Sequence, residues 1–295
     1  METKAKGNNV YQMVTDRVIN QMKQGIIPWH KPWNGAADGA INYVTRKPYS
    51  LLNQMLLGRD GEWLTFHQLK QLGGSIKKGA KSGMVVFYTS YTFKREIIGD
   101  EGTTEEKEET IPVLRYYNVF HIDDCTGIES KIEDGKPAVT VEPIEQAEAI
   151  VNGYVSREKE LKFKNDQPSN RAYYSPTCDT VVVPMLSQYT LAEEYYSTTF
   201  HELTHSTMKA NRCDRRSENR NAAFGSANYS REELVAELGS AMICTQAGLD
   251  CDKAFKNSVA YIQGWLKALS NDNKMIVWAA SRAEKAARYI IGETI

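Results

Sequence analysis

The sequence lacks any long apolar run. Its 295 residues contain no stretch near the roughly 20 apolar residues that a membrane-spanning helix needs. The first ten residues, METKAKGNNV, also lack the apolar segment of a secretory signal. We therefore expect a cytoplasmic protein that has no membrane partner.

Cysteine and histidine are both scarce, with five residues of each. The cysteines are odd in number and never spaced C-x2-C, so the sequence predicts neither a disulfide framework nor a cysteine zinc site. They are scattered as Cys125, Cys178, Cys213, Cys244 and Cys251.

The formal net charge of −1 is close to zero, but the charges are unevenly distributed. Residues 1–98 contain 14 Lys/Arg and 6 Asp/Glu, a balance of 14 minus 6, or +8, whereas residues 99–110 contain six acids and one Lys. The composition, 41% hydrophobic and 25% charged, is that of an ordinary globular protein. The basic N-terminal part therefore has an electrostatic role of its own.

Apolar periodicity and glycine and proline positions predict an α+β fold in two domains. The first, residues 1–123, is a small α+β unit, and the second, residues 142–295, is mostly helical with a small sheet. The polar segment 124–141 is predicted to be a linker. Expected N-terminal elements are helices over 11–25, 50–57 and 65–71 and strands over 84–93 and 113–120, with an exposed acidic hairpin or loop over 99–110.

The second domain is expected to begin with a helix over 143–157, followed by short strands within 172–185 and a long helix over 191–210. Three further helices are predicted over 231–246, 253–269 and 274–291. Residues 179–184 are either the edge strand beside a peptide-binding cleft or, more plainly, a buried core strand.

The long helix carries His201-Glu202-Leu203-Thr204-His205. Residues four apart lie on one helical face, so both imidazoles can bind one metal ion, and Glu202 is the candidate general base of a peptidase. A chance HExxH on a surface helix is the alternative. Because only five histidines exist, two of them in this register favour a metal site.

A catalytic zinc usually takes a third protein ligand. The predicted helix YSREELVAELGSA offers Glu233 and Glu237 on one face. We assign Glu233 as the third ligand and Glu237 as the carboxylate that orients His201, and the reverse assignment stays open. Glu232 lies off that face and is expected at the surface. Zn²⁺ is the expected ion, and Mn²⁺ is not excluded by imidazole and carboxylate ligands.

Tyr229, just before the ligand helix, is a candidate donor to the developing oxyanion of a peptidase reaction, although packing explains it equally well.

The N-terminal domain combines aromatic and basic residues in two segments, PWHKPW and IKKGAKSG. Rings that stack on bases and cations that contact phosphates are the ingredients of single-stranded DNA binding. The alternative is that the rings fill a small core and the lysines are merely solvated. The candidate DNA-binding residues are Trp29, Lys31, Trp33, Lys77, Lys78 and Lys81.

The sequence resembles the ArdC-type antirestriction proteins. The similarity lies in YQMVTDRVINQMKQGIIPWHKPW, INYVTRKPYSLLNQMLL, EWLTFHQLKQLGG and IKKGAKSG, and continues through FHELTHSTMKANR and YSREELVAELGSA. The chain departs mildly from the family pattern at YSLLN, where Asn53 is kept. The resemblance implies an N-terminal single-stranded DNA-binding domain joined to a zincin-like metallopeptidase domain, carried on mobile elements and helping incoming DNA to evade host restriction.

Two other functions compete with a DNA-associated metallopeptidase of unknown protein substrate. The first is a DNA-binding protector with a structural metal and no proteolysis. The second is a cytosolic metallopeptidase that cleaves a regulator without binding DNA.

Overall fold

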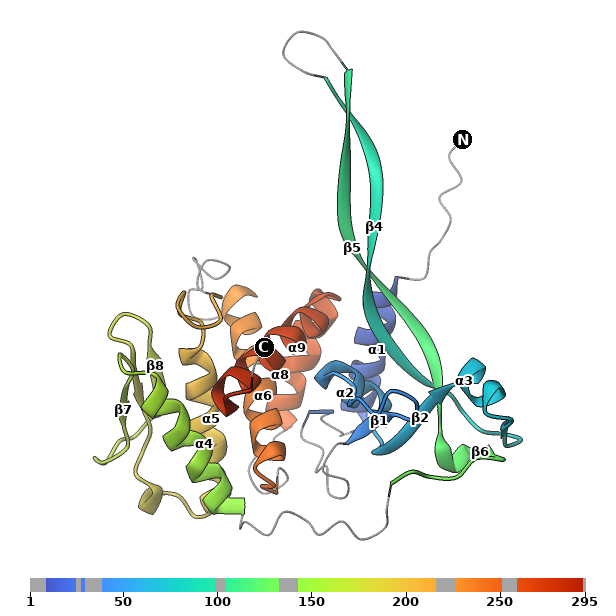
Figure 1. The fold of residues 1–295 in the computed structure, drawn as a ribbon. Helices are drawn as coiled ribbons and strands as arrows, with labels where there is room; N and C mark the ends of the chain where they lie inside the picture. Colours follow the sequence, from blue (N-terminus) through green and yellow to red (C-terminus); the bar gives the residue numbers. More distant parts are fainter. Residues whose placement is uncertain are drawn as a thin grey trace.

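The structure is a computed structural model, which describes residues 9–24, 28–29, 39–98, 104–132, 143–215, 227–250 and 259–293. It shows a helical body beside a smaller sheet, from which a long two-stranded ribbon projects (Figure 1). The α+β class predicted from the sequence is confirmed. None of the helices in the described ranges is long and apolar enough to cross a bilayer.

The first helix, α1 (Val10–Lys23), forms where apolar periodicity predicts it. The side chain of Asn9 caps its first turn by accepting a hydrogen bond from the backbone N–H of Gln12. Its apolar face buries Val14, Val18 and Met22, which gives the helix a side that must dock against other elements.

The N-terminal sheet has the strand order β1-β2-β5-β4. Strand β1 runs parallel to β2, and the remaining pairs are antiparallel. Two of the predicted helices are present as α2 and α3. The elements are β1 (Ala40–Asn42), α2 (Leu51–Leu57), β2 (Gly61–Thr65), α3 (Phe66–Gln71), β3 (Ser75–Ile76), β4 (Gly83–Ile98) and β5 (Thr104–His121).

Strands β4 and β5 form the ribbon, paired without a break from Gly83 with Val119 to Ile98 with Thr104. The described end of the acidic segment, 104–110, therefore lies in a strand of a hairpin. On the side of Met84, Val86 and Leu114 the base of the ribbon is buried in the main core.

The first residues of the predicted linker are ordered with the N-terminal sheet. After the short helix η1 (Ile122–Asp124), strand β6 (Cys125–Thr126) pairs with β3. The backbone N–H of Lys77 also donates to the carbonyl of Asp124 at 2.9 Å. The rest of the predicted linker, from 133 to 141, lies outside the described residues.

The C-terminal half contains a sheet of order β7-β9-β8 and a group of helices. Strand β9 is central, so the alternative that placed residues 179–184 at the sheet edge is wrong, and β8 occupies the edge near α5. The helix expected over 191–210 ends at Ser206. The elements are α4 (Pro143–Arg157), β7 (Lys162–Lys164), β8 (Tyr173–Ser175), β9 (Thr180–Val182), η2 (Leu186–Gln188), α5 (Ala192–Ser206), α6 (Ala227–Gln246), α8 (Val259–Asn271) and α9 (Met275–Ile291).

One apolar core joins the two halves of the chain. It contains Val14 and Leu52 from the N-terminal helices together with Leu238 and Ile276 from α6 and α9. Polar contacts reinforce this junction: the backbone N–H of Leu51 donates to the Glu284 carboxylate at 3.0 Å. The N-terminal helices are thus docked on the helices of the C-terminal half.

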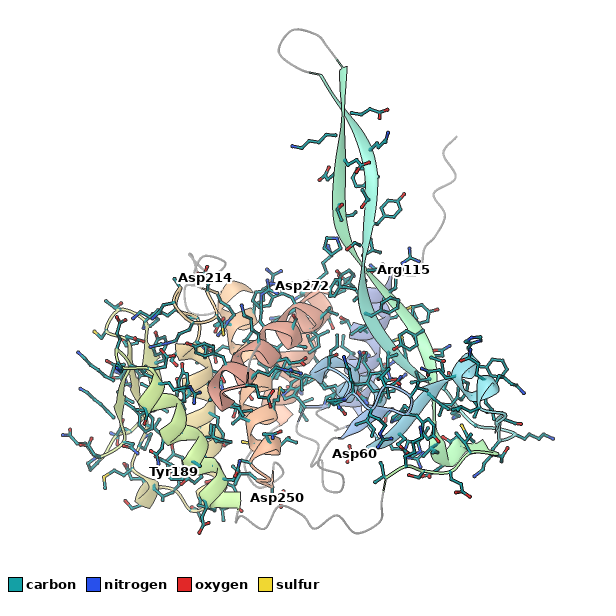
Figure 2. All side chains as sticks on the ribbon, in the orientation of Figure 1. Asp60, Arg115, Tyr189, Asp214, Asp250 and Asp272 are labelled. Atoms are coloured by element: carbon teal, nitrogen blue, oxygen red, sulfur yellow. The ribbon has the colours of Figure 1, made fainter. Side chains whose placement is uncertain are left out.

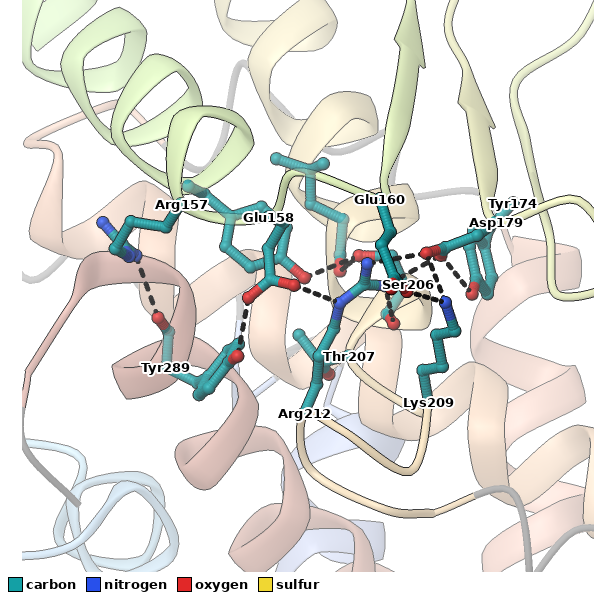
Figure 3. A network of polar contacts seen from close by, with 12 residues as sticks. Arg157, Glu158, Glu160, Tyr174, Asp179, Ser206, Thr207, Lys209, Arg212 and Tyr289 are labelled. Atoms are coloured by element: carbon teal, nitrogen blue, oxygen red, sulfur yellow. Dashed lines mark hydrogen bonds and ion pairs between the residues drawn. The ribbon is translucent and has the colours of Figure 1, made fainter.

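The turn after α5 is held by a buried polar network (Figure 3). The Arg212 guanidinium donates to both oxygens of Asp179, at 2.9 and 2.8 Å, and to Glu158 at 2.7 Å. Lys209 also donates to Asp179 at 2.9 Å. Because Asp179 immediately precedes β9, the network fixes the end of α5 against the small sheet.

We expect Asp179→Asn to lower the free energy of unfolding by about 3 kcal/mol at pH 7, since the buried Arg212 would lose one of its two carboxylate partners and keep only Glu158. Burial raises the pKa of Asp179, but hydrogen bonds from Arg212, Lys209 and Tyr174 outweigh burial and place it below its ordinary 3.8. A depressed pKa in the folded state stabilises the protein above the ordinary value, and this contribution is lost as the pH falls below 3.8.

Urea unfolding followed by circular dichroism at several pH values measures this difference. The gap between wild type and Asp179→Asn should be constant between pH 5 and 7 and should shrink below pH 3.8. The exposed Asp166→Asn is the matched control. Equal stability of wild type and Asp179→Asn at pH 7 would contradict the assignment.

Candidate metal centre

Helix α5 presents His201 and His205 on the same face, and their Nε2 atoms lie 3.2 Å apart. Another side of the same helix is apolar. There Phe200 and Leu203 are fully buried in the core of the C-terminal half. Packing of these two side chains sets the rotation of the helix, so the histidine face is directed toward α6.

Helix α6 supplies the third group of the cluster. The Glu233 carboxylate has one oxygen 3.5 Å from Nε2 of His201 and the other 3.5 Å from Nε2 of His205. A tetrahedral ion with bonds of about 2.0–2.1 Å holds its ligand atoms about 3.3 Å apart. The two imidazole nitrogens stand at about this spacing, and one ligand atom from each of the three side chains lies within 4.8 Å of the others, so the cluster is compact enough to hold one ion.

The close approach of α5 and α6 depends on a glycine. A Cβ atom at Gly239 would meet Cγ2 of Thr204 at 2.7 Å and its Oγ1 at 2.9 Å, closer than packed atoms allow. Next to it, the Ser240 hydroxyl donates to the carbonyl of Ser197 at 2.7 Å. A larger side chain at 239 would push the helices apart and move Glu233 away from the histidines.

The other ring nitrogens of both histidines face carboxylates of α6. Oε1 of Glu237 lies 3.8 Å from Nδ1 of His201, and Oε1 of Glu232 lies 3.5 Å from Nδ1 of His205. The expectation that Glu232 is a surface residue is therefore wrong. It is 4% exposed, because the start of α6 is packed under the turn that follows α5.

Arg215 balances the charge of Glu232. Its guanidinium, 2% exposed as a residue, donates to both carboxylate oxygens of Glu232, at 2.7 and 3.2 Å. It also donates to the Thr207 hydroxyl at 2.8 Å and to the Thr204 carbonyl at 3.0 Å. Arg215 was not predicted from the sequence, because nothing in its sequence neighbourhood distinguishes it from the other arginines.

Glu202 is buried beside the cluster. Burial raises the pKa of its carboxyl above the ordinary value, while the two histidines and a hydrogen bond from the Tyr174 backbone oppose the rise. A carboxyl group with a raised pKa is better matched to taking up and returning a proton near neutral pH.

The site contains more acidic than basic ionisable side chains. Burial lowers the pKa of His201, but its hydrogen bond with Glu233 and the charges of Glu237 and Glu202 outweigh burial and raise it to about 9. Four carboxylates surround the two imidazoles, and Arg215 neutralises one of these carboxylates, that of Glu232. A divalent cation is the chemical species that this donor set fits.

The residues predicted to bind DNA are in contrasting positions. Trp29 is 1% exposed and packs edge-on against Trp265, with ring centroids 6.4 Å apart. The prediction that its ring stacks on a base is corrected, because the main core covers both of its faces. Lys31 and Trp33 lie outside the described residues. Lys77, Lys78 and Lys81 are exposed around the turn between β3 and β4.

Tyr229 lies in the first turn of α6, but its side chain is outside the described part of the structure. Its predicted role as an oxyanion donor stays a prediction. A second tyrosine is near the site: the charge of Glu202 is among the factors that raise the pKa of Tyr189, after burial. Nothing in the sequence distinguishes Tyr189 among the 16 tyrosines.

Comparison with known proteins agrees with this architecture. The family of N-terminal domains of the anti-restriction factor ArdC matches residues 8–120, and the family of zincin-like metallopeptidases matches residues 147–282. The metal-free crystal structure of the antirestriction ArdC protein from plasmid R388 has a TM-score of 0.70 at 32% identity, covering 97% of this chain and 100% of that one. Its Mn(II)-bound crystal structure has a TM-score of 0.69 at 31% identity, covering 96% and 97%.

Two curated relatives extend the comparison. The DNA primase TraC of Escherichia coli is 29% identical over 298 residues, which is 95% of this chain and 20% of TraC. The uncharacterized protein y4eC of Sinorhizobium fredii is 29% identical over 296 residues, 96% of this chain and 91% of that protein. The chain thus spans about a fifth of TraC.

The fold and the site define a protein with a zincin-like metallopeptidase domain next to an ArdC-type N-terminal domain. The chain is 32% identical to the R388 protein over the full length of that protein. It therefore belongs to the family of ArdC antirestriction proteins.

We expect the purified protein to bind about one divalent ion per chain, and His201→Ala and Glu233→Ala to lose it, since each removes one of three ligand groups. Glu237→Gln should keep the ion with affinity reduced about 10- to 100-fold, because only the partner of His201 Nδ1 changes. Elemental analysis and competition with a chelator measure both effects. Glu193→Ala, in the first turn of α5, is the control. Metal retained by Glu233→Ala would refute the ligand assignment.

Removal of Arg215 should destabilise the fold more than removal of the whole ion pair. Arg215→Met leaves the buried Glu232 carboxylate without its guanidinium partner, which costs about 3–5 kcal/mol. In Arg215→Met/Glu232→Leu that carboxylate is gone as well, so most of this loss should be recovered. Chemical denaturation of both variants tests the pair, and a double variant no more stable than Arg215→Met would contradict this account.

Proposed function

We propose that this protein is a metal-dependent peptidase that acts on a protein bound to, or working on, single-stranded DNA. The observation that carries the peptidase part is the cluster of His201, His205 and Glu233, at mutual distances of 3.2–3.5 Å, with buried Glu202 beside it. This is the arrangement of ligands and general base that peptide hydrolysis at a metal site uses.

In this proposal His201, His205 and Glu233 hold a divalent ion, Zn²⁺ or Mn²⁺. Bound there, the ion supplies Lewis acidity, which makes water a stronger nucleophile and polarises a carbonyl group. Glu202 accepts a proton from the attacking water and returns it to the leaving amine, and its raised pKa suits both steps. Glu237 and Glu232 orient the two imidazoles through their Nδ1 atoms. Tyr229 is the proposed donor to the oxyanion.

The substrate peptide is proposed to lie along β8. This strand is at the edge of the small sheet, contacts α5, and its residue Tyr174 reaches Glu202 through the backbone. An extended peptide that pairs with an edge strand gains main-chain hydrogen bonds, and in this proposal pairing with β8 brings the carbonyl groups of the peptide to the metal cluster.

The DNA-binding part is assigned to residues 1–123 and the peptidase part to residues 142–295, with 124–141 between them. Support comes from the match to the ArdC N-terminal domain and from the exposed lysines around the turn between β3 and β4. In a cytoplasmic setting this combination would protect incoming mobile-element DNA from host restriction, in keeping with the antirestriction title of the R388 relative.

Glu202→Gln should keep the bound metal and the affinity for single-stranded DNA but lose peptidase activity, because only proton transfer needs the carboxylate. The measurement compares new N-termini in a bacterial lysate supplemented with single-stranded DNA and either wild type or Glu202→Gln. Peptides whose N-termini appear only with wild type identify the substrate.

Transfer of unmodified plasmid into a restriction-proficient host separates the main proposal from its rival. Loss of protection by Glu202→Gln supports proteolysis as the mechanism. Full protection by Glu202→Gln, with no wild-type-specific N-termini, would mean that the protein shields DNA by occupancy and that its metal is structural.

A further inference from the structure

The ribbon of β4 and β5 has two faces with different environments. Residues paired across an antiparallel ladder point to the same side, and successive residues alternate. Met84, Val86 and Leu114 lie on one face and are buried against the helices. At its base the other face is buried in a second core, which contains Val85 and Val119 and against which Tyr117 packs. Beyond that base the face carries Phe87, Tyr91, Phe93, Ile111, Val113 and Arg115, and these residues together with Tyr117 are called the open face.

The open face presents aromatic rings that the fold does not bury. Phe87 is 42% exposed and Tyr91 is 52% exposed, although apolar and aromatic residues usually seek burial. The rings form two groups. Phe87 meets Tyr117 edge-on at 5.5 Å, and Tyr91 stacks with Phe93 at 6.1 Å and an interplanar angle of 25°.

The two groups are spaced along the strand. Phe87 and Tyr91 are four residues apart, about 13 Å at about 3.3 Å per residue. Figure 2 shows the side chains of the outer part of this ribbon standing clear of the helical body. Two separated ring groups on a free surface can each receive a base of an extended strand, which a compact core cluster cannot do.

The charge on this part of the ribbon favours a polyanion. In the part of the ribbon nearer the body, residues 83–93 contain no charged residue and residues 110–120 contain one, Arg115. Arg115 is exposed and pairs in register with Phe87 on the open face. A ring and a guanidinium side by side provide stacking for a base and a partner for its phosphate.

The far end of the ribbon has the opposite charge. Residues 105–109 contain four Glu and one Lys, and Lys94 is engaged by Glu106 at 2.7 Å. Phosphates are repelled there, so a bound strand is limited to the part of the ribbon nearer the body.

We propose that single-stranded nucleic acid binds the open face, with bases stacked on Phe87 and Tyr91 and a phosphate held by Arg115. This inference rests on the proposed function, since it names the surface through which the N-terminal half engages DNA. The open face takes the base-stacking role predicted for Trp29, whose ring is buried in the core and cannot contact DNA.

The test is fluorescence anisotropy of a short fluorescein-labelled oligothymidylate titrated with the full chain at low salt. Phe87→Ala/Tyr91→Ala should bind at least about tenfold more weakly than wild type, since each lost ring removes the stacking of one base. Tyr91→Phe keeps a ring and should bind nearly as wild type does. Arg115→Gln should reduce the slope of log affinity against log salt by about 0.7, the loss of one phosphate contact.

Tyr116→Ala is the matched control, because Tyr116 is 37% exposed on the opposite face of the same ribbon. Equal binding by wild type and Phe87→Ala/Tyr91→Ala, or an equal loss in Tyr116→Ala, would overturn the open face as the binding surface. Failure of the wild type itself to bind the oligothymidylate would instead overturn the DNA-binding part of the proposed function. Thermal melting shows that the variants are folded.

Discussion

The metal centre depends on how closely α5 and α6 approach each other. The helices meet where Gly239 faces Thr204, and the absence of a side chain at Gly239 brings the backbone of α6 against α5. That contact sets the distance from Glu233 to the two histidines, which belong to a helix about 30 residues earlier in the chain. Every other feature of the site is arranged around this junction: the core side chains of α5 fix its rotation, and the turn after α5 is tied down by Arg212 and Arg215.

Electrostatics explains why so many polar groups are built around a short stretch of helix. Four carboxylates near two imidazoles repel one another unless a cation is present, and the fold neutralises one of them, Glu232, with a buried arginine. Glu202, Glu233 and Glu237 add negative charge around the two histidines, which favours a divalent ion there. On the ribbon, by contrast, the rings of Phe87 and Tyr91 and the guanidinium of Arg115 stay exposed.

Sequence reasoning succeeded where the relevant contacts are local. The spacing of His201 and His205 determines that both lie on one face of a helix, and the same periodicity located α1, α4 and the C-terminal helices. It failed where burial depends on distant segments. Trp29 was read as a stacking ring and is a core residue, because α8 brings Trp265 against it. Glu232 was read as exposed and is buried, because the loop after α5 folds back over the start of α6.

The sequence by itself determined the family, the helix that carries HExxH and the identity of the chemical groups, since these depend on residue types and on spacings within a few turns. Only the tertiary structure decided which glutamate stands among the histidines, which one is neutralised by Arg215, and which aromatic rings remain exposed. Those outcomes depend on contacts between residues far apart in the chain, such as Gly239 with Thr204 and Trp29 with Trp265. A one-dimensional pattern does not contain such distances, because they arise only when apolar faces from both halves are buried in one core.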